Sequence, residues 1–348
     1  MRVELFDFDL PADLVAQRPV EPREAARLLV VGEGLADRRV ADLPELLAPG
    51  DLLVLNDSRV LPTRFWGRRG PVAVEATLVE PAGEDAWWAL ARPGRRLRPG
   101  DRLRLGHDLA AEVRAKDAEG RVLLAFDRAG PDLVRAIEEQ GAMPLPPYIR
   151  RPAGGDPRDL RDYQPIQARV EGSVAAPTAS LHLTEALLDR LAARGIERAF
   201  VTLHVGQGTF APVKVEETEA HRMHRERGAI PAATAEAIAR TRVRGGRVVA
   251  MGTTVLRALE SRARGDGRVE PGGFATELFV TPGFRFRVVD RLVTNFHLPR
   301  STLFMLVCAF TGLDRMRAAY AHAVAERYRF FSYGDACLLD RHAEPAPA

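Results

Sequence analysis

The hydrophobic pattern outside residues 65–146 alternates between runs that suit buried strands and longer amphipathic stretches that suit helices. The continuous apolar run at 52–55 follows a Pro-Gly-Asp turn and predicts a buried strand. Residues 184–194 predict a helix with Thr184 as its cap. Further strands are expected at 27–31, 198–204, 247–251, 274–281 and 288–294, and further helices at 11–17, 232–244, 254–262, 301–310 and 313–328. Such alternation is typical of an α/β layered domain.

The pattern changes between residues 65 and 126, where only short apolar runs occur. The runs lie at 72–79, 86–91, 101–105 and 121–126, and turns rich in Pro, Gly and Asp separate them. Regular short strands without a helical period favour a small all-β, barrel-like unit. A helix at 131–141 and a proline-rich connector at 143–148 follow it. We therefore expect an α/β domain of residues 1–64 plus 147–348, with an inserted all-β, barrel-like domain at 65–146.

Composition narrows the class of protein. The 348 residues are 46% hydrophobic and 28% charged, which is typical of a globular chain. The two cysteines, Cys308 and Cys337, indicate a reducing compartment and exclude a three-cysteine iron–sulfur site and a Cys-built zinc site. The N-terminus carries acidic residues where a signal peptide would be apolar, and the longest apolar run, 303–310, is too short to span a bilayer. A cytoplasmic, soluble protein without membrane contact is expected, acting as a monomer.

The positive charge is nearly all arginine. Lys116 and Lys214 are the only lysines in a chain of net charge +3. Because a guanidinium binds phosphate in a bidentate manner and stacks on bases, the composition permits nucleic acid as a partner. A general compositional bias toward arginine explains the same observation equally well.

Polar residues interrupt the apolar pattern directly after several expected strands. Asn56, Asp57 and Arg59 follow the buried strand at 52–55, where α/β proteins place their ligands. His204 ends the expected strand 198–204, and a histidine at such a position can transfer a proton near neutral pH. For one histidine alone, a buried structural role is the usual case, but His182, His221, His224 and His297 lie in comparable loops, which favours a functional role for the set.

Further loops combine glycine with hydroxyl, imidazole or aromatic groups. The loop at 172–184 suits close approach to an anion before a helix, as does the Gly252-Thr253-Thr254 turn, whose threonines could instead simply cap the helix. The pair His221 and His224 has no third ligand at regular spacing, so we expect no metal site, and Glu226 could orient one imidazole. The segments 294–302 and 331–335 place aromatic rings among hydrogen-bonding groups, which suits a planar base.

Taken together, these motifs resemble the S-adenosylmethionine:tRNA ribosyltransferase-isomerase family of queuosine biosynthesis. The motifs that carry the resemblance are collinear from about residue 6 to residue 339 and lie at 56–64, 146–150, 172–179, 203–206, 252–254, 294–299 and 331–336. The resemblance implies transfer of the ribosyl part of S-adenosyl-L-methionine to 7-aminomethyl-7-deazaguanine at the wobble position of a tRNA anticodon. Epoxyqueuosine-tRNA would form, with release of adenine and methionine. The resemblance also implies an α/β domain with an inserted β-barrel.

The resemblance and the chemistry of that reaction together assign expected roles. Proton transfers dominate and the sulfonium already activates its neighbouring carbon, so histidines and a carboxylate suffice, without a metal or a bound cofactor. The catalytic candidates are His204 and His182, followed by Asp57, Asp335 and His297. The substrate-binding candidates are Asn56, Arg59, Thr178, Gly206, Gly208, Thr209, His224, Gly252, Thr253, Thr254, Asn295 and Tyr333. Arg64, Arg150 and Arg300, together with Arg59, are expected to meet phosphates of the tRNA anticodon arm.

Several positions depart from the family's usual pattern. Ser180, Leu183, Gln207 and Ala211 stand where the family tends to have Gly, Phe, Leu and Arg. The same chemistry on a free deazapurine therefore stays an alternative, as does a non-catalytic tRNA-binding module built on the insertion and the arginines. A methyltransferase is disfavoured, because no Gly-rich turn follows the first strand.

Overall fold

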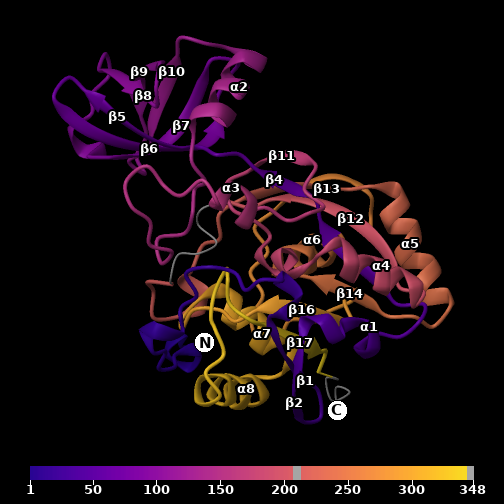
Figure 1. Ribbon diagram of the computed structural model, residues 1–348. Helices are drawn as coiled ribbons and strands as arrows, with labels where there is room; N and C mark the ends of the chain where they lie inside the picture. Colours follow the sequence, from indigo (N-terminus) through magenta and orange to yellow (C-terminus); the bar gives the residue numbers. More distant parts are fainter. Residues whose placement is uncertain (207–212, 343–348) are drawn as a thin grey trace. The chain divides into compact units, whose positions relative to one another are not determined.

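The computed structural model describes residues 1–206 and 213–342. The chain divides into two compact units (Figure 1). The first consists of residues 1–58, 165–170 and 177 onward, and the second consists of residues 59–164 and 171–176. The expected class, an α/β domain with an inserted all-β barrel, is confirmed.

The first unit is built on one mixed sheet, which has nine strands within the described residues. Their order is β15-β13-β12-β3-β14-β16-β17-β1-β2. Strands β12, β3, β14 and β16 run parallel to one another, whereas β17 is antiparallel to β16. The strand bounds are β1 (Arg27–Val31), β2 (Leu35–Arg39), β3 (Leu52–Asn56), β12 (Glu197–His204), β13 (Glu226–Ile230), β14 (Val248–Met251), β15 (Gly272–Thr276), β16 (Arg291–Asn295) and β17 (Ala336–Asp340).

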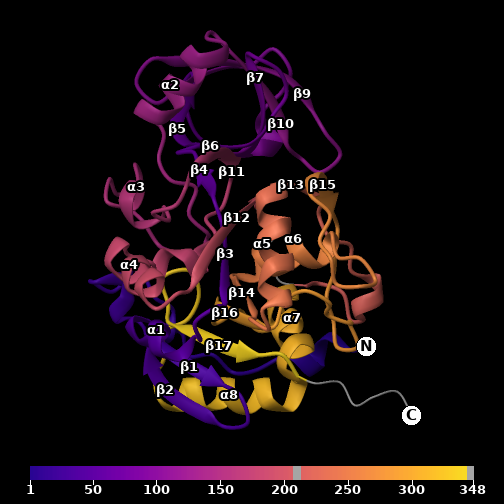
Figure 2. The same ribbon diagram turned by 90° about the vertical axis from the view of Figure 1, so that its right-hand side faces the viewer.

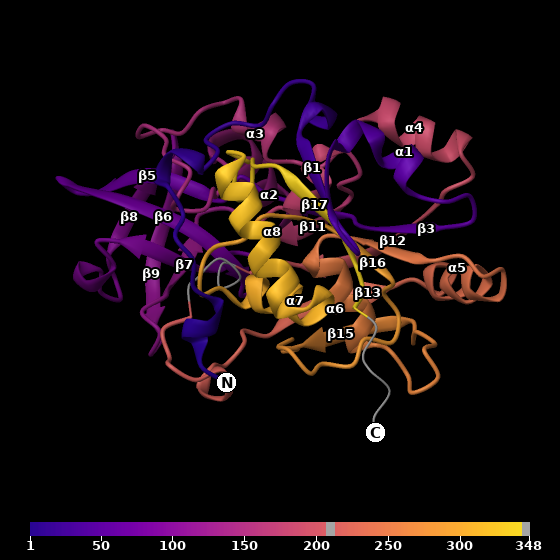
Figure 3. The same ribbon diagram turned by 90° about the horizontal axis from the view of Figure 1, so that it is seen from below.

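Helices cover both faces of this sheet because its central strands are apolar on both faces (Figures 2 and 3). Leu53 and Leu55 of β3 pack with Leu187 and Leu191 of α4 in one core cluster, while Leu52 and Val54 alternate to the other face. Figure 3 shows α1 and α4 on one side of the strands and α6 and α7 on the other. The helix bounds are α1 (Leu43–Leu46), α4 (Glu185–Ala193), α5 (Ala232–Val243), α6 (Thr253–Ser261), α7 (Thr302–Thr311) and α8 (Leu313–Ala325).

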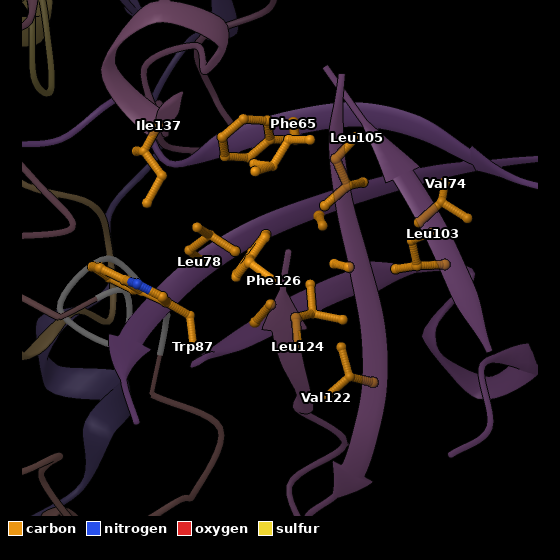
Figure 4. Close-up of a cluster of buried hydrophobic side chains, with 14 of the residues drawn as sticks. Phe65, Val74, Leu78, Trp87, Leu103, Leu105, Val122, Leu124, Phe126 and Ile137 are labelled. Carbon is orange, nitrogen blue, oxygen red and sulfur yellow. The ribbon is translucent and has the colours of Figure 1, made fainter. Parts of the chain in front are cut away.

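The second unit contains a closed barrel of strand order β10-β7-β6-β5-β8-β9. Its residues alternate between a buried interior and an exposed exterior, and the interior forms a core of its own (Figure 4). Ile137 of helix α2 belongs to the same core cluster. The bounds are β5 (Arg64–Arg69), β6 (Val72–Pro81), β7 (Ala86–Arg92), β8 (Arg102–Leu105), β9 (Leu109–Lys116), β10 (Val122–Phe126) and α2 (Gly130–Gln140). A short helix α3 (Asp159–Asp162) follows, and β4 (Ser58–Val60) pairs with β11 (Val170–Ser173).

The unit that contains the barrel is wider than the expected insertion of residues 65–146. The backbone N–H of Val60 donates to Gln164 Oε1, and Gln164 Nε2 donates back to the carbonyl of Val60. The Arg59 guanidinium donates to Glu138 and to Glu171. Residues before position 65 and after position 146 therefore belong to the same compact unit as the barrel.

The helix expected at 313–328 ends at Ala325, and three other predicted elements were wrong in extent for a visible reason. The helix expected at 11–17 is only a 3-10 turn, Ala12–Leu14, because the chain then bonds to Phe330. The strand expected at 274–281 ends at Thr276, whose hydroxyl accepts the N–H of Leu278 in a turn. The strand expected from 288 begins at Arg291 because the preceding backbone N–H groups donate to the Glu260 carboxylate.

Every helix within residues 1–206 and 213–342 is too short or too polar to cross a membrane.

Candidate active site

The parallel strands bring several predicted residues to one edge of the sheet. The carboxyl ends of β12, β3, β14 and β16 meet there, and the chain passes from β3 to β12 on one side and later to β14 on the other. Ligands of open α/β sheets bind at such a reversal of strand order. Asn56, His204 and Asn295 end three of these strands, and Gly252 follows the fourth. The structure therefore places four predicted residues along a common edge.

Asn56 is fully buried and fastens the end of β12. Its side-chain Nδ2 donates to the carbonyl of Leu203 at 3.0 Å, and its Oδ1 accepts the N–H of Leu203 at 3.1 Å and that of Ser58 at 3.1 Å. These bonds fix the backbone next to His204. The geometry favours positioning as the role of Asn56, while the predicted contact with substrate stays a prediction.

One ring nitrogen of His204, Nδ1, is buried but forms no hydrogen bond within the described residues. Burial lowers the pKa of His204, and the negative charge of Asp57 partly counteracts this. Asp57 Oδ1 accepts the hydroxyl of Thr202 at 2.7 Å, which fixes the carboxylate beside β12. A histidine that is neutral near pH 7 and keeps a lone pair is suited to accept a proton.

The glycines after His204 were predicted to contact substrate. Gly206 follows the end of β12, whereas Gly208 and Thr209 lie outside the described residues. Gln207 and Ala211, two of the departures from the family pattern, also lie outside them.

A second group of polar atoms gathers around the 3-10 helix η6 (Thr178–His182). This helix packs against β16 and against the turn after β14, where a β-carbon placed on Gly252 would lie 3.5 Å from that of Ala179. Four buried atoms have no hydrogen-bond partner among the described residues: Ser180 Oγ, His182 Nε2, Thr254 Oγ1 and Asn295 Oδ1. Leaving one such atom unsatisfied costs about 1–3 kcal/mol, so a group of them makes this region a candidate site for a polar ligand.

His182 belongs to this group and is held neutral. Burial lowers its pKa to about 4, the positive charges of Arg329 and Arg23 act in the same direction, and Asn295 opposes them. A small hollow beside His182 is lined by these two arginines and by Tyr333. Thr178 begins η6 at its other end. The predicted residues His182, Tyr333 and Asn295 are thus neighbours of one site.

The Gly252-Thr253-Thr254 turn opens helix α6 at the same edge. Gly252 adopts a positive φ of 98°, and its N–H donates to the carbonyl of Val293 at 2.7 Å. The N-cap of the helix is Gly252, and no side chain donates or accepts a capping hydrogen bond there. The structure therefore does not support capping as the role of the two threonines. The first N–H groups of α6 and two buried hydroxyls together suit an anion or a ribose hydroxyl.

Asp335 is tied to the protein backbone. Its Oδ1 accepts the N–H of Arg27 at 3.0 Å, and its Oδ2 accepts the N–H of Arg329 at 2.8 Å. Burial raises the pKa of Asp335, against the lowering effect of these bonds and of the two arginine charges. This geometry favours a structural role, so the catalytic role expected for Asp335 stays a prediction.

His297 is likewise tied to neighbouring groups. Its Nε2 lies 3.1 Å from Thr294 Oγ1, and its backbone N–H donates to the Tyr320 hydroxyl at 2.9 Å. Thr294 precedes Asn295 in β16, so its side chain points to the opposite face of the sheet. Burial lowers the pKa of His297 to about 3. The arrangement favours a buried structural histidine, and its catalytic role stays a prediction.

Stability is expected to depend on pH through His297. The unfolded chain binds a proton near pH 6.5 and the folded His297 only near pH 3, so its contribution is complete above pH 6.5 and is lost as the pH falls. Compared with His297→Gln, the wild type should lose about 1.4 kcal/mol more unfolding free energy per pH unit between pH 6 and pH 4.5. Urea unfolding of both proteins at several pH values checks this, and parallel pH profiles would contradict it.

One buried ion pair was missed by the sequence prediction. Arg257, one turn into α6, pairs with Glu226 at the start of β13, and their side chains are 2% and 4% exposed. The Arg257 Nε donates to the carbonyl of Leu278 at 3.1 Å, while its Nη2 has no hydrogen-bond partner among the described residues. An arginine inside the apolar segment 255–259 was the signal available in the sequence. Glu226, expected to orient an imidazole, pairs with this guanidinium.

The remaining histidines of that region lie outside this polar group. His221 contacts the ring of Phe279 at a centroid distance of 5.2 Å, and burial and the charge of His224 lower its pKa. His224 is exposed. No group of three or more metal ligands occurs within residues 1–206 and 213–342.

The arginines expected to meet tRNA phosphates differ in how they are held. Arg64 donates to Glu75 at 2.8 Å and lies over the ring of Trp66, and Arg59 is paired with two glutamates. Arg150 and Arg300 are exposed. Arg59, Arg64 and Arg150 belong to the second unit, and Arg300 belongs to the first.

Comparison with known proteins decides the family. The model of a family described as "Queuosine biosynthesis protein" matches residues 3–339. The chain belongs to this family. The resemblance seen in the motifs is thereby confirmed, and the family is one of enzymes.

Relatives with known names match this chain over nearly its full length. It is 57% identical over 99% of its length to a Rhodospirillum rubrum protein named S-adenosylmethionine:tRNA ribosyltransferase-isomerase, of which 100% is covered. It is 59% identical to a Methylobacterium protein of the same name, with 98% of this chain and 99% of the relative covered. A crystal structure of an S-adenosylmethionine tRNA ribosyltransferase from Thermotoga maritima matches with 38% identity and a TM-score of 0.55, covering 96% of this chain and 99% of that chain.

Two departures from the family pattern can be placed in the structure. Leu183 is fully buried in the core cluster of α4 and β3, away from polar partners. Ser180 belongs to the polar group of η6. Of these two, only Ser180 lies among the polar atoms of the candidate site.

Proposed function

We propose that this protein transfers and isomerises the ribosyl moiety of S-adenosyl-L-methionine onto 7-aminomethyl-7-deazaguanine at the wobble position of a tRNA anticodon. Epoxyqueuosine-tRNA is the product, and adenine and methionine are released. The observation that carries the proposal is the match to named ribosyltransferase-isomerases over the whole length of the chain. The lowered pKa values of His204, at the end of β12, and of His182, in η6 beside β16, support it.

His204 is the base in this proposal. The sulfonium of S-adenosylmethionine acidifies the C–H bonds next to it, so a neutral imidazole is strong enough to take a proton there. The available Nδ1 of His204 supplies the lone pair, and Asp57 stabilises the imidazolium that forms. The amine of the deazaguanine attacks the ribose, adenine leaves, and rearrangement of the ring expels methionine.

The polar group around η6 holds the co-substrate in this proposal. The N–H groups and hydroxyls at the start of α6 bind the ribose hydroxyls or the methionine carboxylate. His182, kept neutral by burial, forms a hydrogen bond with the departing adenine. No metal and no bound cofactor is required, since S-adenosyl-L-methionine is consumed as a co-substrate.

Adenine release tests this function and its alternatives. The protein is incubated with S-adenosyl-L-methionine and, separately, with tRNA bearing the deazaguanine precursor, with unmodified tRNA and with the free base. We expect adenine only with precursor-bearing tRNA. Adenine with the free base alone would indicate the free-deazapurine alternative, and tRNA binding without adenine would indicate a non-catalytic module.

A further inference from the structure

The outer surface of the barrel carries arginines that the protein does not neutralise. The segment from Arg92 to Arg104 contains six arginines and one acidic residue, Asp101. The Asp101 carboxylate is already taken, because it accepts Arg69 Nη1 at 2.8 Å and the N–H of Arg98 at 2.7 Å. We define the arginine patch as Arg68, Arg92, Arg95, Arg96, Arg98 and Arg104. All six are exposed, and within the described residues none forms a direct salt bridge; the pKa of Asp101 is lowered mainly by Arg69, and the charge of Arg98 adds to this.

The members of the arginine patch lie close together. Arg68 of β5 and Arg104 of β8 are direct partners in the antiparallel pairing of these strands, which Figure 1 shows side by side. The guanidinium of Arg69, the last residue of β5, donates to the carbonyl of Arg96 at 2.7 Å. This bond holds the segment between β7 and β8 next to the end of β5. Arg92 lies opposite Glu75, but the Glu75 carboxylate bonds Arg64.

This arrangement is unfavourable for the barrel alone. Two like charges directly opposite each other on paired strands destabilise the sheet. Arginines elsewhere on the same barrel are paired: Arg114 with Asp85, Arg121 with Asp117, and Arg128 with Asp108. A general excess of arginine in the sequence does not explain why the unpaired ones gather on β5, on β8, at the end of β7 and in the segment between β7 and β8.

We propose that the arginine patch binds the sugar–phosphate backbone of the tRNA substrate. Guanidinium groups without internal partners are free to form bidentate contacts with phosphates. Trp66 lies two residues before Arg68 on the same outward row of β5, and the Arg64 guanidinium lies over its ring, so another cation borders the patch. The patch supplies affinity and salt dependence and takes no part in the chemistry. This inference rests on the proposed function, because it takes the partner to be tRNA.

A charge-matched pair of variants tests the arginine patch. The first variant is Arg68→Thr with Arg104→Thr. The control is Arg114→Thr with Arg128→Thr, which removes two paired arginines from the same barrel. We expect the first to weaken tRNA binding about tenfold at 0.1 M salt and to reduce the slope of log K against log salt by about 1.4 to 1.8. The control should leave both nearly unchanged, and turnover at saturating tRNA should stay normal in both variants.

A charge-retaining variant and a measurement of thermal stability separate lost binding from lost folding. Arg68→Lys with Arg104→Lys, which retains the charge, should keep most of the affinity and the salt slope. At low salt Arg68→Thr with Arg104→Thr should unfold at a temperature no lower than the wild type, which shows that lost binding is not lost folding. An unchanged salt slope, or equal weakening in the control, would overturn the inference. Binding is measured without turnover, so a failure of the proposed reaction is distinguished from a failure of the patch.

Discussion

Replacing His204 with Gln is expected to lower turnover by about two orders of magnitude or more while the protein stays folded. Glutamine keeps a similar size and polarity but cannot take a proton near neutral pH. The neighbouring backbone is held by Asn56 and the side chain is only half-buried, so the scaffold should tolerate the change. Single-turnover release of adenine, at saturating S-adenosylmethionine and tRNA, measures the effect.

A surface histidine provides the control for this variant. His322 lies on α8, where its ring contacts Asp37 away from the sheet edge. His322→Gln should retain normal turnover. If His204→Gln turned over at the wild-type rate with an intact fold, His204 would be removed from the mechanism and His182 would become the leading base.

Replacing Arg257 with Met is expected to cost about 3–5 kcal/mol of unfolding free energy. The pair with Glu226 is buried, so removal of the guanidinium takes this positive charge away from a carboxylate in the core. The double variant Arg257→Met with Glu226→Leu should recover much of this loss, because it removes both charges. Urea unfolding of the wild type, both single variants and the double variant measures the coupling.

The size of the loss decides whether this pair is structural. A cost below about 1 kcal/mol for Arg257→Met would show that the pair contributes as little as an exposed one, against the burial of both side chains. Arg257 Nη2, in helix α6, also has no hydrogen-bond partner within the described residues and could bind a substrate group. A raised KM for S-adenosylmethionine in Arg257→Lys, at normal stability, would add a substrate contact to the structural one.

Local signals predicted much of the fold. Thr184 was read as a helix cap, and its hydroxyl does accept the N–H of Leu187 at 3.1 Å, because capping depends only on adjacent residues. The strand β13 was missed because its sequence, ERGAI, buries only its first and last residues. The edge strands β2 and β15 also lack a regular apolar pattern. Where burial is one-sided or absent, the sequence pattern carries little information.

The sequence predicted individual residues of the candidate site but not the contacts between them. Asn295 and His182 are distant in the sequence, and only the packing of η6 on β16 makes them neighbours. Asp335 and His297 have residue types suited to catalysis, yet the backbone bonds of Asp335 and the Thr294 and Tyr320 contacts of His297 could not be read from sequence. Arg257 was overlooked because its partner, Glu226, belongs to a strand that was not predicted.

The fate of labelled carbon tests the central claim most directly. S-Adenosylmethionine carrying ¹⁴C either in its ribose or in its methyl group is incubated with the protein and precursor-bearing tRNA, and the tRNA is then recovered. The proposed reaction predicts that ribose label enters the tRNA in step with adenine release, and that methyl label remains with free methionine. Methyl label in the tRNA, or ribose label that stays entirely in small molecules, would contradict it.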